Sequence, residues 1–531
     1  MPTVRRTLRR LAPLLVIVTA CVAPQPLRGA RVEPPRLVVV VTVDQMRADY
    51  LSRFGGQFRG GLARLLRDGS VFTHAYHDHA IPETAAGHAT LLSGRFPRST
   101  GIILNGLGVD DPESPLIDGA RGAGASPHRF RGTSLLDWMR GADPRARALS
   151  VSGKDRGAIL PLGRARGDVY WLAAGRFTTS RYYRDTLPTW VRAYNARQMP
   201  ARYLGRDWTL LLPDSAYAEP DSVAMEGAGH DFLFPHRAPR DSAYAAGFVA
   251  RTPWGDEIVL DFALDGVQAL GIGTGPQSDL LNVSLSTTDA IGHVYGPDSR
   301  EMHDQMLRLD RALGVFLDSL FRLRDPAQVV VVLTADHGAA PLPERSAEHE
   351  RPIPMRVEPS DVLAEVRQGL RARGVDTSAV ELALGLVLLD RPALERARLD
   401  VDSLLQALAV SARRTPGVLR ADFMRDLRAA NPARDPIARR WAHQLPTGTP
   451  VEMVVTLRPY NIWWSDNVAS HHSPHDYDTH VPLVFLGAPF APGRYADAVR
   501  TVDLAPTLAA VLKVKPLEPV DGVVLRQAIR E

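Results

Sequence analysis

A near-continuous run of β-branched residues, RLVVVVTV at positions 36–43, is the feature that most restricts what this chain can fold into. Because the apolar residues are nearly continuous, a strand made of them has no polar face, which is typical of a parallel strand that is covered on both sides. The run stops at Asp44, a polar residue placed where such a strand would end. The sequence therefore predicts a sheet with helices packed on both of its faces.

Similar apolar runs recur along the chain, and helical patterns at 60–69 and 303–323 lie between some of them. This alternation predicts an α/β protein with a mostly parallel central sheet, covered by helices on both faces. The further runs lie at 147–153, 279–286, 328–338, 451–457 and 480–487.

The length of 531 residues fits one large domain with insertions. Two long stretches, at about 165–275 and 342–465, interrupt the strand order, and we expect them to cap the sheet. A Pro-rich joint at 22–35 precedes the domain. We therefore expect a single catalytic α/β domain from 36 to 531.

The first 21 residues have the pattern of an export signal. Four arginines precede an apolar run, Leu11 to Val18, that is too short to span a bilayer. The run ends in Val-Thr-Ala-Cys, which resembles the bacterial lipobox, and Cys21 is the only cysteine of the chain. Two interpretations stay open: Cys21 is lipidated, or the segment is a plain cleaved signal. Both predict a protein on the periplasmic side of a bacterial membrane, attached to it only through such an anchor.

Charge adds little about partners. The formal net charge is +4, and the arginines are scattered along the whole chain. No concentrated basic stripe favours a nucleic-acid partner. The sequence contains no signal of an oligomeric state.

Polar residues follow several of the predicted strands. In open α/β sheets, ligands bind at the carboxyl ends of the strands, so side chains at these positions are expected to converge there. They are Asp44, Lys154, Asp289, Asp336 and His337.

Carboxylates and imidazoles at these strand ends suit a zinc-like ion. Asp289 and His293 stand four residues apart, so on a helix they face the same side. Asp336 and His337 are adjacent, and Asp44 is a further candidate ligand. Each has an ordinary alternative, since Asp after a strand is often a helix cap and a loop histidine is usually solvated. Their coincidence at successive strand ends favours a metal centre. A third source of histidines is ASHHSPHDYDTHVP at 469–482.

Together these motifs resemble the alkaline phosphatase superfamily and, within it, the PafA-like alkaline phosphatases with a threonine nucleophile. The resemblance extends over nearly the whole mature chain, through VTVDQMRADY, TAAGHATLLSG, GIILN, SGKDRGAILP, STTDAIGHVYGPDS, TADHG and YDTHVPLVFLG. It implies a site with two zinc ions and a phosphothreonine intermediate. In that resemblance Asp44, Thr84, Asp336 and His337 hold one metal ion, while Asp289, His293 and His471 hold the other.

One position departs from the family pattern. The family usually has His-Gly-Ser where this chain has His471, His472 and Ser473. Counting back from YDTHVP favours His471 as the ligand, and an exchange with His472 stays open.

Thr84 begins a helical pattern, where it has two possible uses. A threonine at a helix start is an ordinary cap, whereas the resemblance implies that its hydroxyl is the nucleophile. Free backbone N–H groups at the same helix start favour an anion.

Three further residues bear on the substrate. Lys154 and Arg156, two apart on an expected extended segment, and Asn105 offer donors for phosphoryl oxygens. In the family these positions resemble the phosphate clamp of monoesterases, which related nucleotide pyrophosphatase/phosphodiesterases lack. We therefore expect hydrolysis of small-molecule phosphate monoesters. The alternatives are a phosphodiesterase of the same superfamily and a surface lipoprotein that binds without turnover.

Overall fold

The computed structural model describes residues 33–530. The predicted export signal and Cys21 lie outside the described residues. Within the described part, no helix is both long enough and apolar enough to cross a bilayer.

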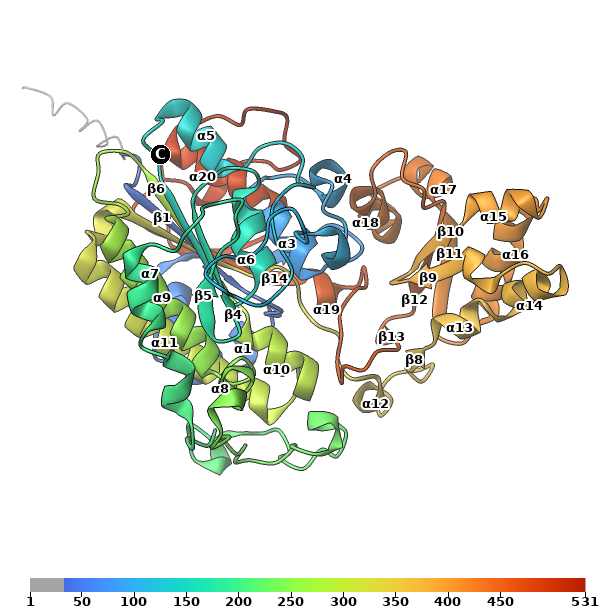
Figure 1. The fold of residues 1–531 in the computed structure, drawn as a ribbon, viewed down its shortest axis with the longest axis horizontal. Coiled ribbons are helices and arrows are strands. Elements are labelled where there is room, and N and C mark those ends of the chain that lie inside the picture. The colour runs from blue at the N-terminus through green and yellow to red at the C-terminus, as the bar shows by residue number, and fades with distance from the viewer. Residues whose placement is uncertain (1–32, 531) are drawn as a thin grey trace, which may run out of the picture. The chain divides into compact units, whose positions relative to one another are not determined.

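A nine-stranded sheet forms the centre of the fold and confirms the predicted α/β class (Figure 1). Most neighbouring strands are parallel, including β1 with both β6 and β7. In spatial order the strands are β15 (Gly493–Arg500), β2 (Ser70–Tyr76), β14 (His480–Leu486), β7 (Val329–Thr334), β1 (Leu37–Val43), β6 (Asp279–Leu285), β3 (Ala148–Ser152), β4 (Asp168–Ala173) and β5 (Arg176–Thr178).

Strand β1 shows why its sequence is apolar throughout. Val39 and Val41 belong to one hydrophobic core, while Val38 and Val40 belong to a second core on the opposite face. Since successive side chains of a strand point to opposite faces, both faces of the sheet are covered, as predicted. Helices α2 (Gly61–Asp68), α9 (Trp254–Leu270) and α11 (Arg300–Leu323) pack in the first core, and α3 (Thr84–Leu91), α5 (Leu135–Ala142), α6 (Asp155–Ile159) and α20 (Leu504–Leu512) in the second.

Strand β14 differs in direction from the strands around it. It pairs antiparallel with β7 and with β2, so its N-terminal end lies at the edge where β7 ends. Strand β5 is also antiparallel to its neighbour β4. A periodic apolar pattern indicates a strand but not its direction, which depends on how the chain returns to the sheet.

The two stretches expected as insertions differ in structure. Residues 165–275 include β4 and β5 at the sheet edge, as well as α9 on its face. The stretch 342–465 contains a separate antiparallel sheet and a core of its own, and the apolar run at 451–457 forms β12 there. Its strands, in spatial order, are β11 (Val418–Phe423), β12 (Met453–Leu457), β10 (Leu386–Leu389) and β9 (Val380–Ala383).

The stretch 342–465 also contains a short pair of parallel strands and several helices. The two strands, β8 (Arg356–Val357) and β13 (Ile462–Trp463), lie near its two ends. The helices are α12 (Pro343–Ser346), α13 (Pro359–Val362), α14 (Ala364–Ala372), α15 (Arg391–Arg396), α16 (Val401–Arg414), α17 (Met424–Ala429) and α18 (Pro436–Gln444).

Candidate metal centre and active site

The polar residues predicted at the strand ends meet at one edge of the central sheet. Asp44 directly follows β1, and Asp336 and His337 come just after β7. Asp289 lies in the first turn of helix α10 (Thr287–Tyr295), which begins soon after β6. Because β1 lies between β6 and β7 and runs parallel to both, all of these side chains reach the same edge.

Asp44, Asp336 and His337 form the first of two ligand groups. Their ligand atoms all lie within 4.8 Å of one another. His337 Nε2 is 3.3 Å from Asp44 Oδ1 and 3.8 Å from Asp336 Oδ2. All three side chains are fully buried, and none of these three atoms makes a hydrogen bond. Buried polar atoms are normally satisfied, so this convergence fits a bound cation.

Asp289, His293 and His471 form the second group, again with ligand atoms within 4.8 Å of one another. Asp289 and His293 are one helical turn apart on α10, as predicted, and His293 Nε2 lies 3.2 Å from Asp289 Oδ1. His471 reaches them from a segment far along the chain. Each group thus combines carboxylate and imidazole, the donor types that zinc accepts.

The three histidines of the two groups share one arrangement. Nδ1 of each ring lies within hydrogen-bonding distance of a backbone carbonyl, which can only accept, so Nδ1 must be the donor. The Nε2 atom is therefore the one left to bind a metal ion, an arrangement that is common at metal sites. The acceptors are Gly338 for His337 at 2.9 Å, Ala469 for His293 at 2.8 Å and Pro82 for His471 at 2.8 Å.

The antiparallel direction of β14 explains why His471 lies beside the other metal-ligand candidates. The segment that precedes β14 lies at the edge where β7 ends, and the N–H of Gly338 donates to the carbonyl of Asp478 at 2.7 Å. The His337 and His471 rings stack with centroids 3.8 Å apart. A parallel strand in this place would have put its N-terminal end at the opposite edge.

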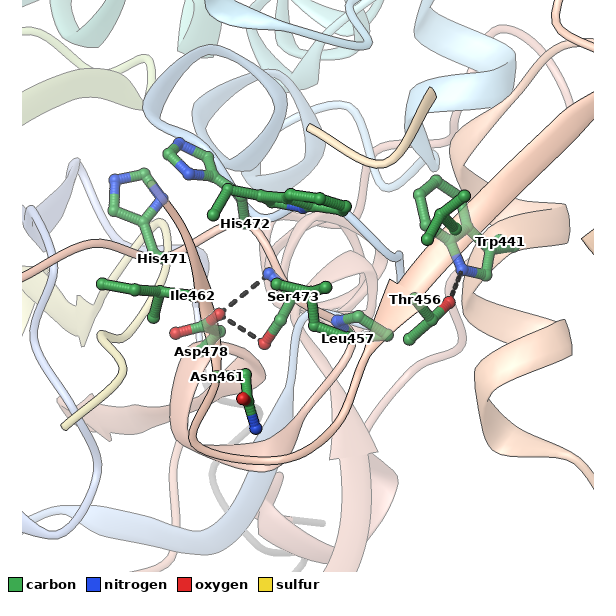
Figure 2. A pocket seen from close by; sticks show the side chains of 12 residues that line it. Trp441, Thr456, Leu457, Asn461, Ile462, His471, His472, Ser473 and Asp478 are labelled. Carbon is green, nitrogen blue, oxygen red and sulfur yellow. Dashed lines mark hydrogen bonds between the residues drawn. The ribbon is translucent and has the colours of Figure 1, made fainter. Parts of the chain in front are cut away.

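His471 and His472 are adjacent but have different partners; Figure 2 shows both rings among the side chains that line a pocket. His471 belongs to the second ligand group, whereas Nε2 of His472 lies 3.2 Å from Oε1 of Glu83. The Asp478 carboxylate accepts hydrogen bonds from the N–H and hydroxyl of Ser473 at 2.8 and 2.6 Å, which fixes the turn that follows. These residues also line a small cavity with Trp441 and Thr456.

The site brings three buried carboxylates together, those of Asp44, Asp289 and Asp336. Burial, together with the Asp44 carboxylate, raises the pKa of Asp336 to about 8. Burial by itself lowers the pKa of His337, but the Asp336 and Asp44 carboxylates outweigh it and raise this pKa to about 10. The carboxylates thus favour any positive charge between them, which is the property of a cation site.

Lys154 and Gln45 connect the two groups. The Nζ of Lys154 lies 2.6 Å from Asp44 Oδ2 and 2.5 Å from Asp289 Oδ2. Gln45 donates from its backbone N–H to Asp336 Oδ1 at 3.1 Å and from Nε2 to Asp289 Oδ1 at 2.8 Å. Sequence reasoning missed Gln45. No local pattern marks it, because its partners lie far along the chain, and Gly292 leaves room for its side chain, since an added Cβ there would lie 1.8 Å from Gln45 Oε1.

Thr84 is the first residue of α3, and it is buried. Glu83 occupies the N-cap position, and α3 has no side-chain cap, so Thr84 does not serve as one. Gly87 allows the helix to approach the sheet, because a Cβ there would lie 2.2 Å from the carbonyl oxygen of Asp336. The helix start with Thr84 is therefore held against the strand end of the first ligand group.

Asn105 lies beside the same helix start. Its Oδ1 accepts a hydrogen bond from the N–H of Ala85 at 2.9 Å. The first N–H after Thr84 is thus taken, in contrast to the expected free donors at this helix end. Since Oδ1 is the acceptor, the Nδ2 group of Asn105 remains as a donor for another partner.

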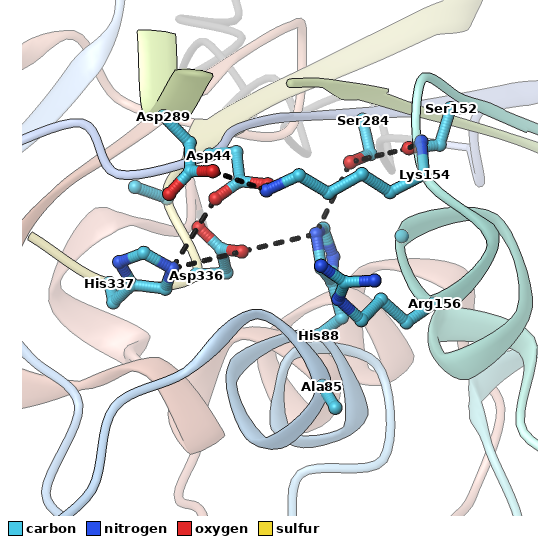
Figure 3. A network of polar contacts seen from close by, with 12 residues as sticks. Asp44, Ala85, His88, Ser152, Lys154, Arg156, Ser284, Asp289, Asp336 and His337 are labelled. Carbon is cyan, nitrogen blue, oxygen red and sulfur yellow. Dashed lines mark hydrogen bonds and ion pairs between the residues drawn. The ribbon is translucent and has the colours of Figure 1, made fainter. Parts of the chain in front are cut away.

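Lys154 and Arg156 lie on different elements. Lys154 is extended, but Arg156 is the second residue of helix α6, so they do not share one extended face. Their side chains nevertheless extend toward the same network, with α3 across from them (Figure 3). The Arg156 Nε is buried without a hydrogen-bond partner. On α3, Nε2 of His88 lies 3.4 Å from Asp336 Oδ2 and 3.2 Å from the hydroxyl of Ser284.

Helix α18, in the stretch 342–465, is tied to the loops that lead to the site. The Oε1 of Gln444 accepts the N–H of Ile81 at 2.9 Å, and its Nε2 donates to the carbonyl of Ile103 at 2.7 Å. These two residues shortly precede Thr84 and Asn105. One buried side chain therefore connects both loops.

Comparisons with known proteins agree with this architecture. A family model described as type I phosphodiesterase / nucleotide pyrophosphatase matches residues 38–378. The chain is 30% identical over 510 residues to alkaline phosphatase PafA of Elizabethkingia meningoseptica, with 91% of this chain and 92% of that protein covered. It is also 30% identical over 509 residues to alkaline phosphatase PhoV of Synechococcus elongatus, covering 91% of this chain and 90% of that one.

A solved structure shows the same likeness in three dimensions. The crystal structure of wild-type alkaline phosphatase PafA matches with a TM-score of 0.87 and 28% identity, covering 94% of this chain and all of that chain. The agreement extends over both the central sheet and the stretch 342–465.

Proposed function

Because the chain belongs to the type I phosphodiesterase / nucleotide pyrophosphatase family and aligns over nearly its whole length with two alkaline phosphatases, we propose that it is itself an alkaline phosphatase. Its reaction is the hydrolysis of small-molecule phosphate monoesters to an alcohol and inorganic phosphate. The observation that supports this most is the pair of ligand groups at the start of α3, where Thr84 lies.

Two zinc ions fit the ligand groups. Asp44, Asp336 and His337, with the Thr84 hydroxyl, would hold one, while Asp289, His293 and His471 would hold the other. When bound, two divalent cations stabilise charge on the attacking and leaving oxygens of an in-line displacement.

The residues of the chain supply the nucleophile and the hydrogen-bond donors for the phosphoryl group. The Thr84 Oγ loses its proton, forms a bond to phosphorus and displaces the alcohol of the substrate, which takes up a proton as it leaves. Water next attacks the phosphorus and gives up a proton, the bond to Oγ breaks and Oγ takes up a proton, and inorganic phosphate is released. Asn105 Nδ2, Lys154 and Arg156 are the donors for the nonbridging phosphoryl oxygens.

A preference for monoesters follows from this donor set. A monoester presents a dianion, and the cationic groups Lys154 and Arg156 attract it more strongly than they attract a singly charged diester.

The N-terminal sequence supports a location in the periplasm, with Cys21 as the site of a lipid anchor. These are parts of the same proposal.

The test is the kcat/KM of the zinc-loaded protein without residues 1–21 on p-nitrophenyl phosphate and on bis-p-nitrophenyl phosphate, at alkaline pH. We expect a strong preference for the monoester. A preference for the diester would replace this proposal by a phosphodiesterase. Turnover of neither would leave the alternative of a surface lipoprotein that binds without catalysis.

A further inference from the structure

Glu83 is a buried carboxylate next to Thr84 with no part in the chemistry described so far. Its side chain is 6% exposed. Oε2 accepts a hydrogen bond from the backbone N–H of Asn105 at 2.6 Å, and Oε1 lies 3.2 Å from Nε2 of His472. The two oxygens thus connect two separate segments of the site.

Asn105 also makes a hydrogen bond to the residue that follows Thr84. Its Oδ1 accepts the N–H of Ala85, so the residues before and after Thr84 are both bonded to Asn105. The backbone of Asn105 is held by Glu83, and its amide is oriented by Ala85. This reciprocal pair fixes Thr84 and the Asn105 Nδ2 donor relative to each other.

His472 occupies a backbone conformation that disfavours a side chain. Its φ is 96°, in the left-handed region where glycine is usual. The ring is 16% exposed, and its Nδ1 lies 3.3 Å from the hydroxyl of Ser470. The ring therefore stands between Ser470 and Glu83 at a cost in backbone conformation. A buried carboxylate requires such a partner, because unpaired buried charge is strongly unfavourable.

We propose that Glu83 is a positioning residue that sets the Asn105 amide against Thr84 for phosphoryl binding, and that His472 is the partner that holds the Glu83 carboxylate in place. Neither residue touches the substrate. The inference rests on the proposed function, since it takes Asn105 as a donor to the phosphoryl group.

The first test compares Glu83→Ala and Glu83→Gln with the wild type. Glu83→Ala loses both contacts, so we expect phosphate binding, measured by calorimetry with inorganic phosphate, to weaken about tenfold or more. The monoester kcat/KM should fall with it, while the diester kcat/KM changes less. Glu83→Gln keeps an oxygen for the Asn105 N–H and should recover most of the loss. Glu113→Ala, the same change at an exposed residue, should match the wild type.

The second test removes the partner. His472→Gly deletes the ring, and glycine adopts a φ of 96° without strain, so lost function would not come from backbone strain. We expect weaker phosphate binding with unchanged zinc content. A loss of zinc in this variant would overturn the proposal, because it would show that the ring supports the ligand His471 instead.

The decisive measurement is a double-mutant cycle with Asn105. If Glu83 acts through Asn105, Glu83→Ala should change phosphate affinity less than twofold in an Asn105→Ala background. Equal losses in both backgrounds would overturn the positioning role. A wild-type protein that binds phosphate but does not hydrolyse the monoester would overturn the proposed function instead, and the affinity cycle would still decide the role of Glu83. If Glu83→Ala does not fold, the same cycle is measured with His472→Gly, which removes the partner of Glu83 and is expected to weaken phosphate binding.

Discussion

The Nε of Arg439, on helix α18, lies 3.0 Å from both carboxylate oxygens of Asp78, which follows strand β2. Asp78 is buried and also lies 3.3 Å from Nδ1 of His443 on the same helix. Since Asp78 begins the loop that leads to Thr84, this ion pair fastens the stretch 342–465 to the segment of the proposed nucleophile.

From the ion pair of Asp78 we predict that the free energy of unfolding decreases in acid. Burial by itself raises its pKa, but the hydrogen bonds from His443 and Arg439 outweigh burial and hold this pKa well below the usual range. A carboxylate with a depressed folded-state pKa stabilises the fold above the unfolded-state pKa, about 4, and loses this contribution as pH falls further.

The variant Asp78→Asn should therefore be destabilised at pH 7, by about 1.5–3 kcal/mol. Below about pH 4 the difference from the wild type should shrink. Urea unfolding of both proteins across this range measures it, with the exposed Asp466→Asn as the control. A difference that stays constant down to pH 2 would contradict the assigned ion pair.

Thr84→Ala should reduce turnover of p-nitrophenyl phosphate by about a thousandfold, ~4 kcal/mol, because the variant lacks the hydroxyl that forms the bond to phosphorus. Thr84→Ser retains a hydroxyl and should keep far more activity. Activity of Thr84→Ala within about tenfold of the wild type, ~1.4 kcal/mol, would rule out Thr84 as the nucleophile.

Replacing both Lys154 and Arg156 by Ala should lower the monoester kcat/KM at least about tenfold more than the diester kcat/KM, because a dianion depends more on cationic donors. Zinc content must be measured in parallel, since Lys154 also contacts Asp44 and Asp289. Arg145→Ala, which removes only an exposed ion pair, is the control. An equal loss on both substrates would show that the pair serves the fold.

Metal removal should destabilise the protein. The two ligand groups concentrate buried carboxylates, and an ion that binds only the folded state adds about 2.7 kcal/mol when its free concentration is a hundredfold above Kd. A chelator should therefore lower the Tm, and added zinc should restore it. Asp336→Asn should reduce the zinc-dependent part of the shift. A Tm that is insensitive to chelator would count against a metal centre here.

The central sheet was predictable because its signal is local. Runs such as 36–43 contain enough β-branched residues to indicate a doubly covered strand, whatever the rest of the chain does. The direction of β14 was not predictable, because strand direction depends on the path between elements. The same holds for β12, whose run resembles the others but pairs in the second sheet.

In the site, too, the features with a local sequence signal were predictable and those that depend on distant residues were not. Asp289 and His293 were found together because helical spacing is visible in sequence, and the structure places them side by side. Gln45, Glu83 and His88 were missed or left without a role, because their partners lie far away in the chain. For the two adjacent histidines, counting back from YDTHVP favoured His471, and the structure groups His471 with Asp289 and His293, while the ring of His472, at a φ of 96°, lies beside Glu83.

The late position of β14 in the chain bears on the order in which the site can be completed. Ribosomes synthesise the chain from its N-terminus, and His471 is the last ligand in sequence, just ahead of the strand that positions it. A product that terminates early, before residue 471, keeps the whole first ligand group but only Asp289 and His293 of the second. Such a chain also lacks β14, which pairs with both β2 and β7, so it can complete neither the central sheet nor the second ligand group.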